Sequence, residues 1–351
     1  LTYQAQSNAT ALTLSYGASN LVIITPDMSV SVMSNAFRFA PSGARIVFRG
    51  SFTNLQPGFS GSYISDSNAA VALFKLNSKT NTIIEGEAGA EFLFHGTAGM
   101  PFEYRDCQNV ITRNLSIRWA SKPLTPNTDF SVVFNYNNCR DLLFERVRFE
   151  NFHSHAINEQ IVSLRGSSNT VIRYCQFIRG GITNFNGTYP NTDGAAVQLG
   201  AFDTVDSCFF GNLPRGVEIE GAAGNGYQVR QTVTRCVFSN VFEYGVFNIS
   251  AAKGDGLLIT DNFFMFMGDP PPAWTPIAVY ATAGRGLIVQ GNTFLGYAQA
   301  VNVSAGTAGM GGVQIRGNHF RTNGFGIFMS QASGSITGVV INANLFENAT
   351  N

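Results

Sequence analysis

The sequence predicts an all-β chain, a solenoid of short parallel strands about ten coils long. Three observations predict this fold: a phenylalanine recurs near the C-terminal end, an asparagine precedes it by two residues, and a second apolar strand follows it. Phe264, Phe294, Phe320 and Phe346 are 30, 26 and 26 residues apart. A fixed period between about 20 and 50 residues is typical of solenoids.

The phenylalanine column can be followed toward the N-terminus through Phe238, Phe210, Phe177, Phe149 and Ile117. Two residues before each member lies a second column: Leu115, Val147, Cys175, Cys208, Cys236, Asn262, Asn292, Asn318 and Asn344. Side chains two apart in a strand share a face, so both columns are expected to point inward and stack at about 4.8 Å per coil. Buried asparagine amides should then bond one another and the turn backbone.

A further strand follows each column residue, at 161–164, 196–199, 216–219, 246–249, 278–281, 300–303 and 326–329. An antiparallel sandwich or a propeller is the alternative, but propeller blades need about 40–50 residues each. The repeat resembles the right-handed parallel β-helix of the pectin-lyase-like superfamily over roughly residues 44–351. The resemblance implies a single-stranded, right-handed parallel β-helix.

The N-terminal segment, residues 1–43, is expected to hold two strands, at 11–14 and 21–24, and a cap helix at 26–40. Thr25 is the predicted N-cap, and Pro26 and Asp27 suit the first helical turn. A cap would cover the apolar end of the first coil. A strand at 29–32 is the alternative. At the other end, we expect further chain or a partner subunit to cover the last coil.

The composition excludes several classes of partner. The 351 residues carry no net charge and only 13% charged residues, so a basic nucleic-acid surface is absent. No run of eighteen apolar residues occurs, so no membrane-spanning helix is expected. The five cysteines fall in two columns without a Cys-x-x-Cys pair or a histidine, which favours buried thiols or an occasional disulfide over a metal site.

Polar and charged residues gather on the coils of residues 150–250, beside three long connections at 118–130, 178–194 and 265–276. The outward positions of the second strands are predicted to carry Ser163, Arg165, Gln198, Glu218, Glu220, Asn248, Tyr280, Asn302 and Phe328. Just upstream lie His153, His155, Glu159, Asp193, Arg215 and Glu243. Insertions on one face often build a binding site, and Trp274 in the third connection could stack on a sugar ring.

Paired carboxylates are the usual apparatus for breaking glycosidic bonds. Asp193 and Glu218 are expected on neighbouring coils, and Glu159 and Glu218 two coils apart, so the separations of about 5 and 9.6 Å leave the stereochemical outcome open. Asn191-Thr192-Asp193-Gly194 resembles the motif of polygalacturonase-type glycoside hydrolases, whose aspartate belongs to the catalytic acidic set. The family's other motifs are missing, and an Asx turn is the alternative.

The predicted catalytic residues are therefore Asp193, Glu218, Glu220 and Glu159. The predicted substrate-binding residues are His155, Arg165, Arg215, Gln198, Asn248, Tyr280 and Trp274. Arg215 and His155 would also suit a uronate lyase or epimerase, in which the arginine binds a carboxylate as a fork. Calcium-dependent lyases of this fold hold Ca²⁺ with carboxylates, a role open to Glu218 and Glu220; otherwise no cofactor is expected.

The function predicted from the sequence is extracellular binding, and cleavage by glycoside hydrolysis, of a polysaccharide on the face built by residues 150–280. The resemblance extends to phage tailspike and depolymerase proteins, which implies secretion or a place on a virion, and a homotrimer. The alternative from another class is a non-catalytic structural or adhesive β-helix. A lyase or epimerase is the second alternative.

Overall fold

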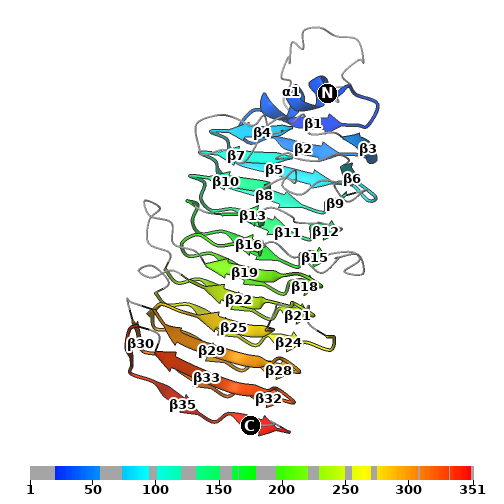
Figure 1. Ribbon diagram of the computed structural model, residues 1–351. Coiled ribbons are helices and arrows are strands. Elements are labelled where there is room, and N and C mark those ends of the chain that lie inside the picture. Colours follow the sequence, from blue (N-terminus) through cyan, green and yellow to red (C-terminus); the bar gives the residue numbers. More distant parts are fainter. Residues whose placement is uncertain are drawn as a thin grey trace.

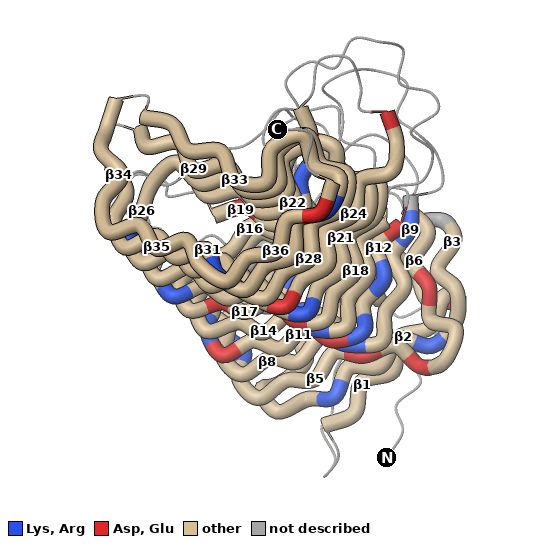
Figure 2. The backbone as a smooth tube through the Cα atoms, turned by 90° about the horizontal axis from the view of Figure 1, so that it is seen from below, with Lys and Arg blue, Asp and Glu red and all other residues tan. Residues whose placement is uncertain are grey.

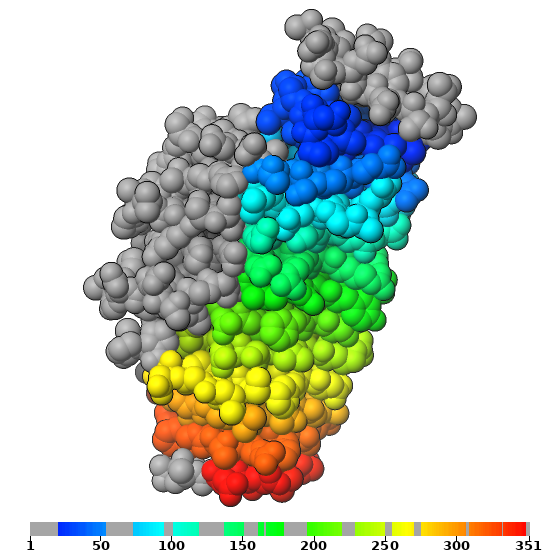
Figure 3. All heavy atoms as spheres, turned by 90° about the vertical axis from the view of Figure 1, so that its right-hand side faces the viewer, coloured from blue at the N-terminus to red at the C-terminus, as the bar shows by residue number. Residues whose placement is uncertain are grey.

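The chain forms a parallel β-helix whose coils stack one per level, with the two ends at opposite extremes (Figure 1). The structure, a computed structural model, describes residues 20–55, 73–94, 101–119, 132–150, 160–164, 166–178, 195–219, 229–249, 255–269, 275–306, 309–331 and 333–348. Every strand pairing in this part of the chain is parallel. The coils appear as successive bands along the molecule (Figure 3).

Each full coil contributes one strand to each of three long sheets, because short turns separate three strands per repeat. The twelve-stranded sheet contains β1 (Leu21–Ile24), β2 (Arg45–Phe48), β5 (Thr80–Gly86), β8 (Gln108–Arg113), β11 (Leu143–Glu145), β14 (Val171–Arg173), β17 (Thr204–Asp206), β20 (Thr232–Thr234), β23 (Leu258–Thr260), β27 (Ile288–Gln290), β31 (Gln314–Arg316) and β35 (Val340–Asn342).

The eleven-stranded sheet carries the phenylalanine column. It contains β3 (Ser51–Leu55), β6 (Glu91–Phe94), β9 (Ser116–Trp119), β12 (Arg148–Glu150), β15 (Gln176–Ile178), β18 (Phe209–Gly211), β21 (Val237–Ser239), β24 (Phe263–Met265), β28 (Thr293–Leu295), β32 (His319–Arg321) and β36 (Leu345–Glu347).

The ten-stranded sheet corresponds to the second strands expected from the sequence. It contains β4 (Phe74–Asn77), β7 (Phe102–Arg105), β10 (Val132–Asn137), β13 (Gln160–Ser163), β16 (Ala195–Gln198), β19 (Arg215–Ile219), β22 (Tyr244–Asn248), β25 (Ile277–Ala281), β29 (Gln299–Ala305) and β33 (Phe325–Gln331). A small sheet of β26 (Gly284–Arg285), β30 (Met310–Gly311) and β34 (Ile336–Thr337) widens the last coils.

The phenylalanine column is confirmed as an inward stack. From Phe149 to Phe346, successive ring centroids are 4.5–5.1 Å apart and the ring planes are within 13° of parallel. Small residues face this stack from the ten-stranded sheet: a Cβ added at Gly216 would lie 2.7 Å from the Phe238 ring. The repeat therefore specifies a large side chain in one sheet and a small one opposite it.

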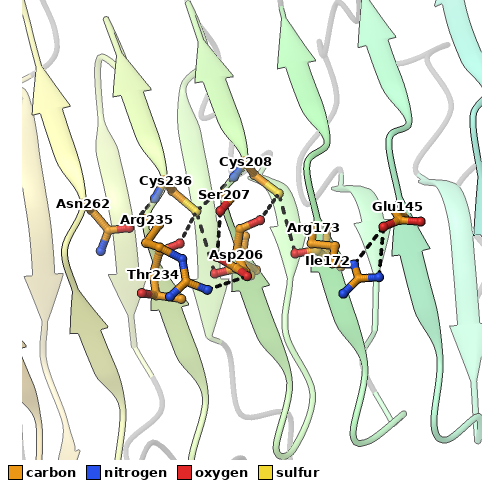
Figure 4. A network of polar contacts seen from close by, with 11 residues as sticks. Glu145, Ile172, Arg173, Asp206, Ser207, Cys208, Thr234, Arg235, Cys236 and Asn262 are labelled. Carbon is orange, nitrogen blue, oxygen red and sulfur yellow. Dashed lines mark hydrogen bonds and ion pairs between the residues drawn. The ribbon is translucent and has the colours of Figure 1, made fainter.

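The second inward column is confirmed as a hydrogen-bonded ladder. Asn262 Nδ2 donates to Asn292 Oδ1 at 2.9 Å, and Asn292 Nδ2 donates to Asn318 Oδ1 at 3.0 Å. Each amide also bonds backbone, as when Asn262 Nδ2 donates to the Val233 carbonyl at 2.9 Å. The ladder is continued by buried, free thiols, since the Cys236 amide donates to Asn262 Oδ1 and the Cys208 amide to Cys236 Sγ (Figure 4).

A cap helix, α1 (Val30–Arg38), covers the N-terminal end of the core. It begins later than the predicted 26–40, and the N-cap is Ser29, whose hydroxyl accepts from the Val32 amide. Thr25 instead starts a turn in which its carbonyl accepts from the Met28 amide. Phe37 of α1 is fully buried and its ring centroid is 5.3 Å from that of Phe74.

Candidate functional site

The outer face of the ten-stranded sheet carries two aligned columns of side chains. The Arg215 column is Ala195, Arg215, Tyr244, Ile277, Gln299 and Phe325, and the Glu218 column is Ser163, Gln198, Glu218, Phe247, Tyr280, Asn302 and Phe328. Parallel strands keep this register over many coils. Neighbouring members of one column therefore lie about 4.8 Å apart, although they are far apart in sequence. Charged and aromatic residues lie next to one another in these two columns.

Arg215 lies between two carboxylates. Its Nε and one terminal nitrogen donate to the two oxygens of Glu243 at 2.7 and 2.8 Å, and its other terminal nitrogen is 3.7 Å from Glu218 Oε2. The exposed fractions of the Arg215, Glu218 and Glu243 side chains are 7%, 3% and 8%. A two-pronged arginine–carboxylate contact is among the strongest and most directional hydrogen-bonded pairs.

Aromatic rings surround the same guanidinium. The Arg215 Cζ atom is 4.9 Å from the Phe247 ring centroid and 5.3 Å from that of Tyr244, within the range of a cation–π contact. Tyr244 lies 4.4 Å from Phe247 and 5.1 Å from Tyr280, centroid to centroid. Phe247 and Tyr280 are almost parallel, with an interplanar angle of 3°. We call Arg215, Glu218, Glu243, Tyr244, Phe247 and Tyr280 the Arg215 cluster.

The electrostatics of the cluster follow from burial and pairing. Arginine is always charged in proteins, and its positive charge lies against both neighbouring carboxyl groups. Low exposure weakens the screening of these charges by water, which strengthens each interaction. The cluster therefore places two carboxyl groups against one positive charge, beside an aromatic wall. Such an arrangement can stabilise positive charge that develops on a bound molecule.

Six of the residues predicted to point outward lie in the Glu218 column: Ser163, Gln198, Glu218, Tyr280, Asn302 and Phe328. Arg215, which was predicted just upstream of these positions, lies in the other column. Gln198, Arg215 and Glu218 are nevertheless buried, whereas an exposed row was expected. Polar groups on neighbouring coils bond one another on this face, as when Ser163 Oγ donates to Gln198 Oε1 at 3.1 Å.

The outward position predicted for Asn248 is wrong. Glu218 pairs in register with Phe247, and Asn248 pairs with Ile219 and Ala281, so Asn248 belongs to the inward set. It is 1% exposed, and its Nδ2 donates to the Ala283 carbonyl at 3.0 Å. Apolar residues occur at both parities of this strand, Val246 at one and Phe247 and Ile249 at the other, so alternation alone could not fix the register. A slip of one residue exchanges the two faces.

The other candidates, Asp193, Glu220, Glu159, His155, Arg165 and Trp274, lie outside the described residues and stay predictions. Three members of the cluster were not among the predicted site residues: Glu243, Tyr244 and Phe247. A signal for Glu243 exists in the sequence, because it follows Arg215 by 28 residues, about one coil, and carries the opposite charge.

Other places in the described part of the chain offer less chemistry. A cavity of about 660 Å³ at the corner between β5 and β6 contains Glu87 and Glu91, but they pair with Arg49 and Arg118. Among the described residues, no three His, Cys, Asp or Glu side chains converge as metal ligands. The same residues contain no helix long and apolar enough to span a membrane.

The comparisons with known proteins agree with this fold. A family model described as a right-handed β-helix region matches residues 214–351. No curated protein matches the chain in sequence. Among solved structures, the tailspike protein of Escherichia coli bacteriophage HK620 in complex with a pentasaccharide is similar, with 12% identity and a TM-score of 0.59 over 87% of this chain and 53% of that one.

Two variants of that tailspike are similar to the same degree. A mutant with a glutamate changed to glutamine, in complex with a hexasaccharide, has 13% identity and a TM-score of 0.58, and covers 87% of this chain and 53% of that one. A double mutant with an aspartate and a glutamate changed to alanine, in complex with a pentasaccharide, has 13% identity and a TM-score of 0.60 with the same coverage. The chain spans about half the length of these tailspikes. At such low identity, the structural similarity shows a shared fold alone.

Proposed function

We propose that this chain binds an extended, neutral polysaccharide on the outer face of the ten-stranded sheet and hydrolyses it there. The observation that carries the proposal is the Arg215 cluster, in which Glu218 and Glu243 share one guanidinium beside Tyr244, Phe247 and Tyr280. The similar tailspikes are described in complex with oligosaccharides, which supports a sugar polymer as the ligand class. We propose a location outside the cell or on a virion for the same reason.

The proposed chemistry is glycoside hydrolysis by two carboxyl groups. Glu218, which lies 3.7 Å from the Arg215 guanidinium, would stabilise the oxocarbenium-like transition state, attack the sugar carbon or activate water. The leaving oxygen needs a proton from a second carboxyl group that starts protonated. Asp193 is our candidate for this acid because it stands two residues before Ala195, the register partner of Arg215. Water is consumed, and one new reducing end forms per bond broken.

Elimination from a uronate is less favoured by the same contacts. A lyase needs a cation free to neutralise the uronate carboxylate, but the fork of Arg215 is already directed at Glu243. This contact favours a neutral substrate.

A non-catalytic adhesive role is the second candidate. The observation in its favour is the burial of Glu218, Arg215 and Glu243, which also suits a structural ionic cluster. Under that alternative the chain would bind a glycan without cleaving it, and the cluster would stabilise the coils.

The test is a reducing-end assay on a panel of neutral and acidic polysaccharides, with ultraviolet absorbance followed in parallel. We expect reducing ends from a neutral polymer without a rise in absorbance. Glu218→Gln and Asp193→Asn should each lower the rate about 100-fold or more while binding persists. Glu145→Gln is the matched control, because Glu145 is also nearly buried and arginine-paired but lies in the twelve-stranded sheet.

Three results would count against this proposal. A rise in absorbance would indicate a lyase. Binding without products from any polymer would favour the adhesive role. Full activity in Glu218→Gln, beside full activity in Glu145→Gln, would remove Glu218 from the chemistry.

A further inference from the structure

The two outer columns continue beyond the Arg215 cluster toward the C-terminal end. There they contain Tyr280, Gln299, Asn302, Phe325 and Phe328, which we call the C-terminal shelf. None of these five side chains carries a charge. The shelf lies on β25, β29 and β33, the last strands of the ten-stranded sheet.

The shelf exposes aromatic surface. Phe325 is 43% exposed and Phe328 is partly exposed, and their ring centroids are 5.8 Å apart at an angle of 64°. Exposed aromatic side chains grouped on one face mark a contact surface more often than isolated ones do. The cluster and the shelf are joined by Tyr280, which pairs in register with Phe247 on one side and Asn302 on the other.

Between the rings lies an amide pair with one unused acceptor. Asn302 Nδ2 donates to Gln299 Oε1 at 2.5 Å. Asn302 is only 7% exposed, and its Oδ1 accepts no hydrogen bond within the part of the chain that the structure describes. An unsatisfied buried acceptor destabilises a fold, so its presence at a surface column calls for an explanation such as a bound donor.

We propose that the C-terminal shelf is a second glycan-binding subsite, specific for uncharged pyranose units rich in hydroxyl groups. The apolar C–H faces of pyranose rings pack on aromatic rings, and a sugar hydroxyl is the donor that Asn302 Oδ1 lacks. A charged polymer would find no counter-charge on the shelf.

The register gives the direction of the bound chain. Glu218, Phe247, Tyr280, Asn302 and Phe328 stand in one column, four coil steps or about 19 Å from end to end. A glycan that starts at Glu218 and follows the column therefore reaches the shelf only if it is several units long. The inference takes the position of the reacting bond, at Glu218, from the proposed function. Binding at the shelf itself does not require that the chain cleaves the glycan.

The test compares Phe325→Ala/Phe328→Ala with Phe263→Ala, an exposed phenylalanine on the outer face of the eleven-stranded sheet. The probe is the neutral polysaccharide with the largest wild-type response, together with labelled oligosaccharides of graded length cut from it. We expect the double variant to bind long chains roughly tenfold more weakly or worse, with unchanged turnover of the shortest cleaved oligosaccharide. Phe263→Ala should match the wild type.

A second variant separates binding from folding. Asn302→Leu removes the unsatisfied acceptor, so we expect an unchanged or higher melting temperature together with weaker binding of long chains. Equal affinity of the wild type, Phe325→Ala/Phe328→Ala and Asn302→Leu for long chains would overturn the shelf and leave cleavage at Glu218 untouched. Wild-type binding that is lost in these variants, without cleavage of any polymer, would support the shelf and refute hydrolysis. Absence of wild-type binding would refute both.

Discussion

The outer faces of the twelve-stranded and ten-stranded sheets use charged residues in different ways. On the twelve-stranded sheet, acids and bases alternate on successive coils, as in Glu145–Arg173 at 2.9 Å and Asp206–Arg235 at 2.7 Å. Lys, Arg, Asp and Glu gather along these strands (Figure 2), and Figure 4 shows both pairs. The arginine side chains there are 40% and 61% exposed, against 7% for Arg215.

The difference shows that exposure to solvent, and not strand register, decides how much a stacked ion pair contributes to stability. Both sheets bring opposite charges together at coil spacing, because both are parallel and in register. Pairs with an exposed arginine contribute little net stability, about 0–1 kcal/mol each, since water already solvates the guanidinium. A buried charge is stable only beside its counter-charge, so removal of one partner is costly. The side chains of the Arg215 cluster are therefore expected to keep fixed positions. The three predictions below test this contrast.

The largest effect is expected from Arg215→Met, which leaves Glu218 and Glu243 buried without their shared cation. We expect a loss of about 3–5 kcal/mol in the free energy of unfolding, measured by urea titration. Arg215→Met/Glu243→Met should recover part of this loss, because it removes one unpaired charge together with its partner. A loss below about 1 kcal/mol for the single variant would show that the cluster behaves like an exposed pair.

A pH effect is expected from Asp203, a fully buried carboxyl beside β17 that meets backbone groups instead of a cation. It accepts from the Gly200 amide at 2.6 Å and the Thr170 amide at 2.8 Å, and burial raises its pKa to about 7. The folded state then holds a proton that the unfolded state releases near pH 4, so stability should fall as pH rises from about 4 to 7 and level off above it. The loss is at most about 4 kcal/mol.

The measurement is thermal unfolding between pH 4 and 8 for the wild type and Asp203→Asn. The variant cannot ionise at this position, so its stability should depend less steeply on pH over that interval. Parallel profiles for the two proteins would assign the pH dependence to other groups.

The smallest effect is expected from Arg173→Met on the twelve-stranded sheet. Its loss should be about 0.2–1 kcal/mol at low ionic strength, because the guanidinium is well solvated. The loss should shrink further in high salt, where charges at exposed sites are screened. Urea titrations at two salt concentrations measure both quantities, and a loss as large as that of Arg215→Met would erase the contrast between the faces.

Much of the fold could be predicted because a solenoid repeats its own packing. The positions of Phe264 and Asn262 recur once per coil, and the side chain at each position stacks on its counterpart in the previous coil. The repeat in the sequence therefore predicts these contacts directly. The predicted start of α1 is four residues early, because Thr25, Pro26 and Asp27 carry start signals as good as those of Ser29. Two possible helix starts have local signals of similar strength. The packing of Phe37 in the helix on Phe48 and Phe74 decides between them.

The sequence by itself determined the coil period, the two inward ladders and the convergence of acids and arginine on one stretch of coils. Only the tertiary structure decided that Phe247, and not Asn248, stands beside Glu218, and that Arg215 directs its fork at Glu243. The physical reason is that a period of about 28 residues fixes which coils are neighbours, whereas the turn at each corner fixes which face a side chain takes. A slip of one residue leaves the repeat intact but exchanges the core for the surface.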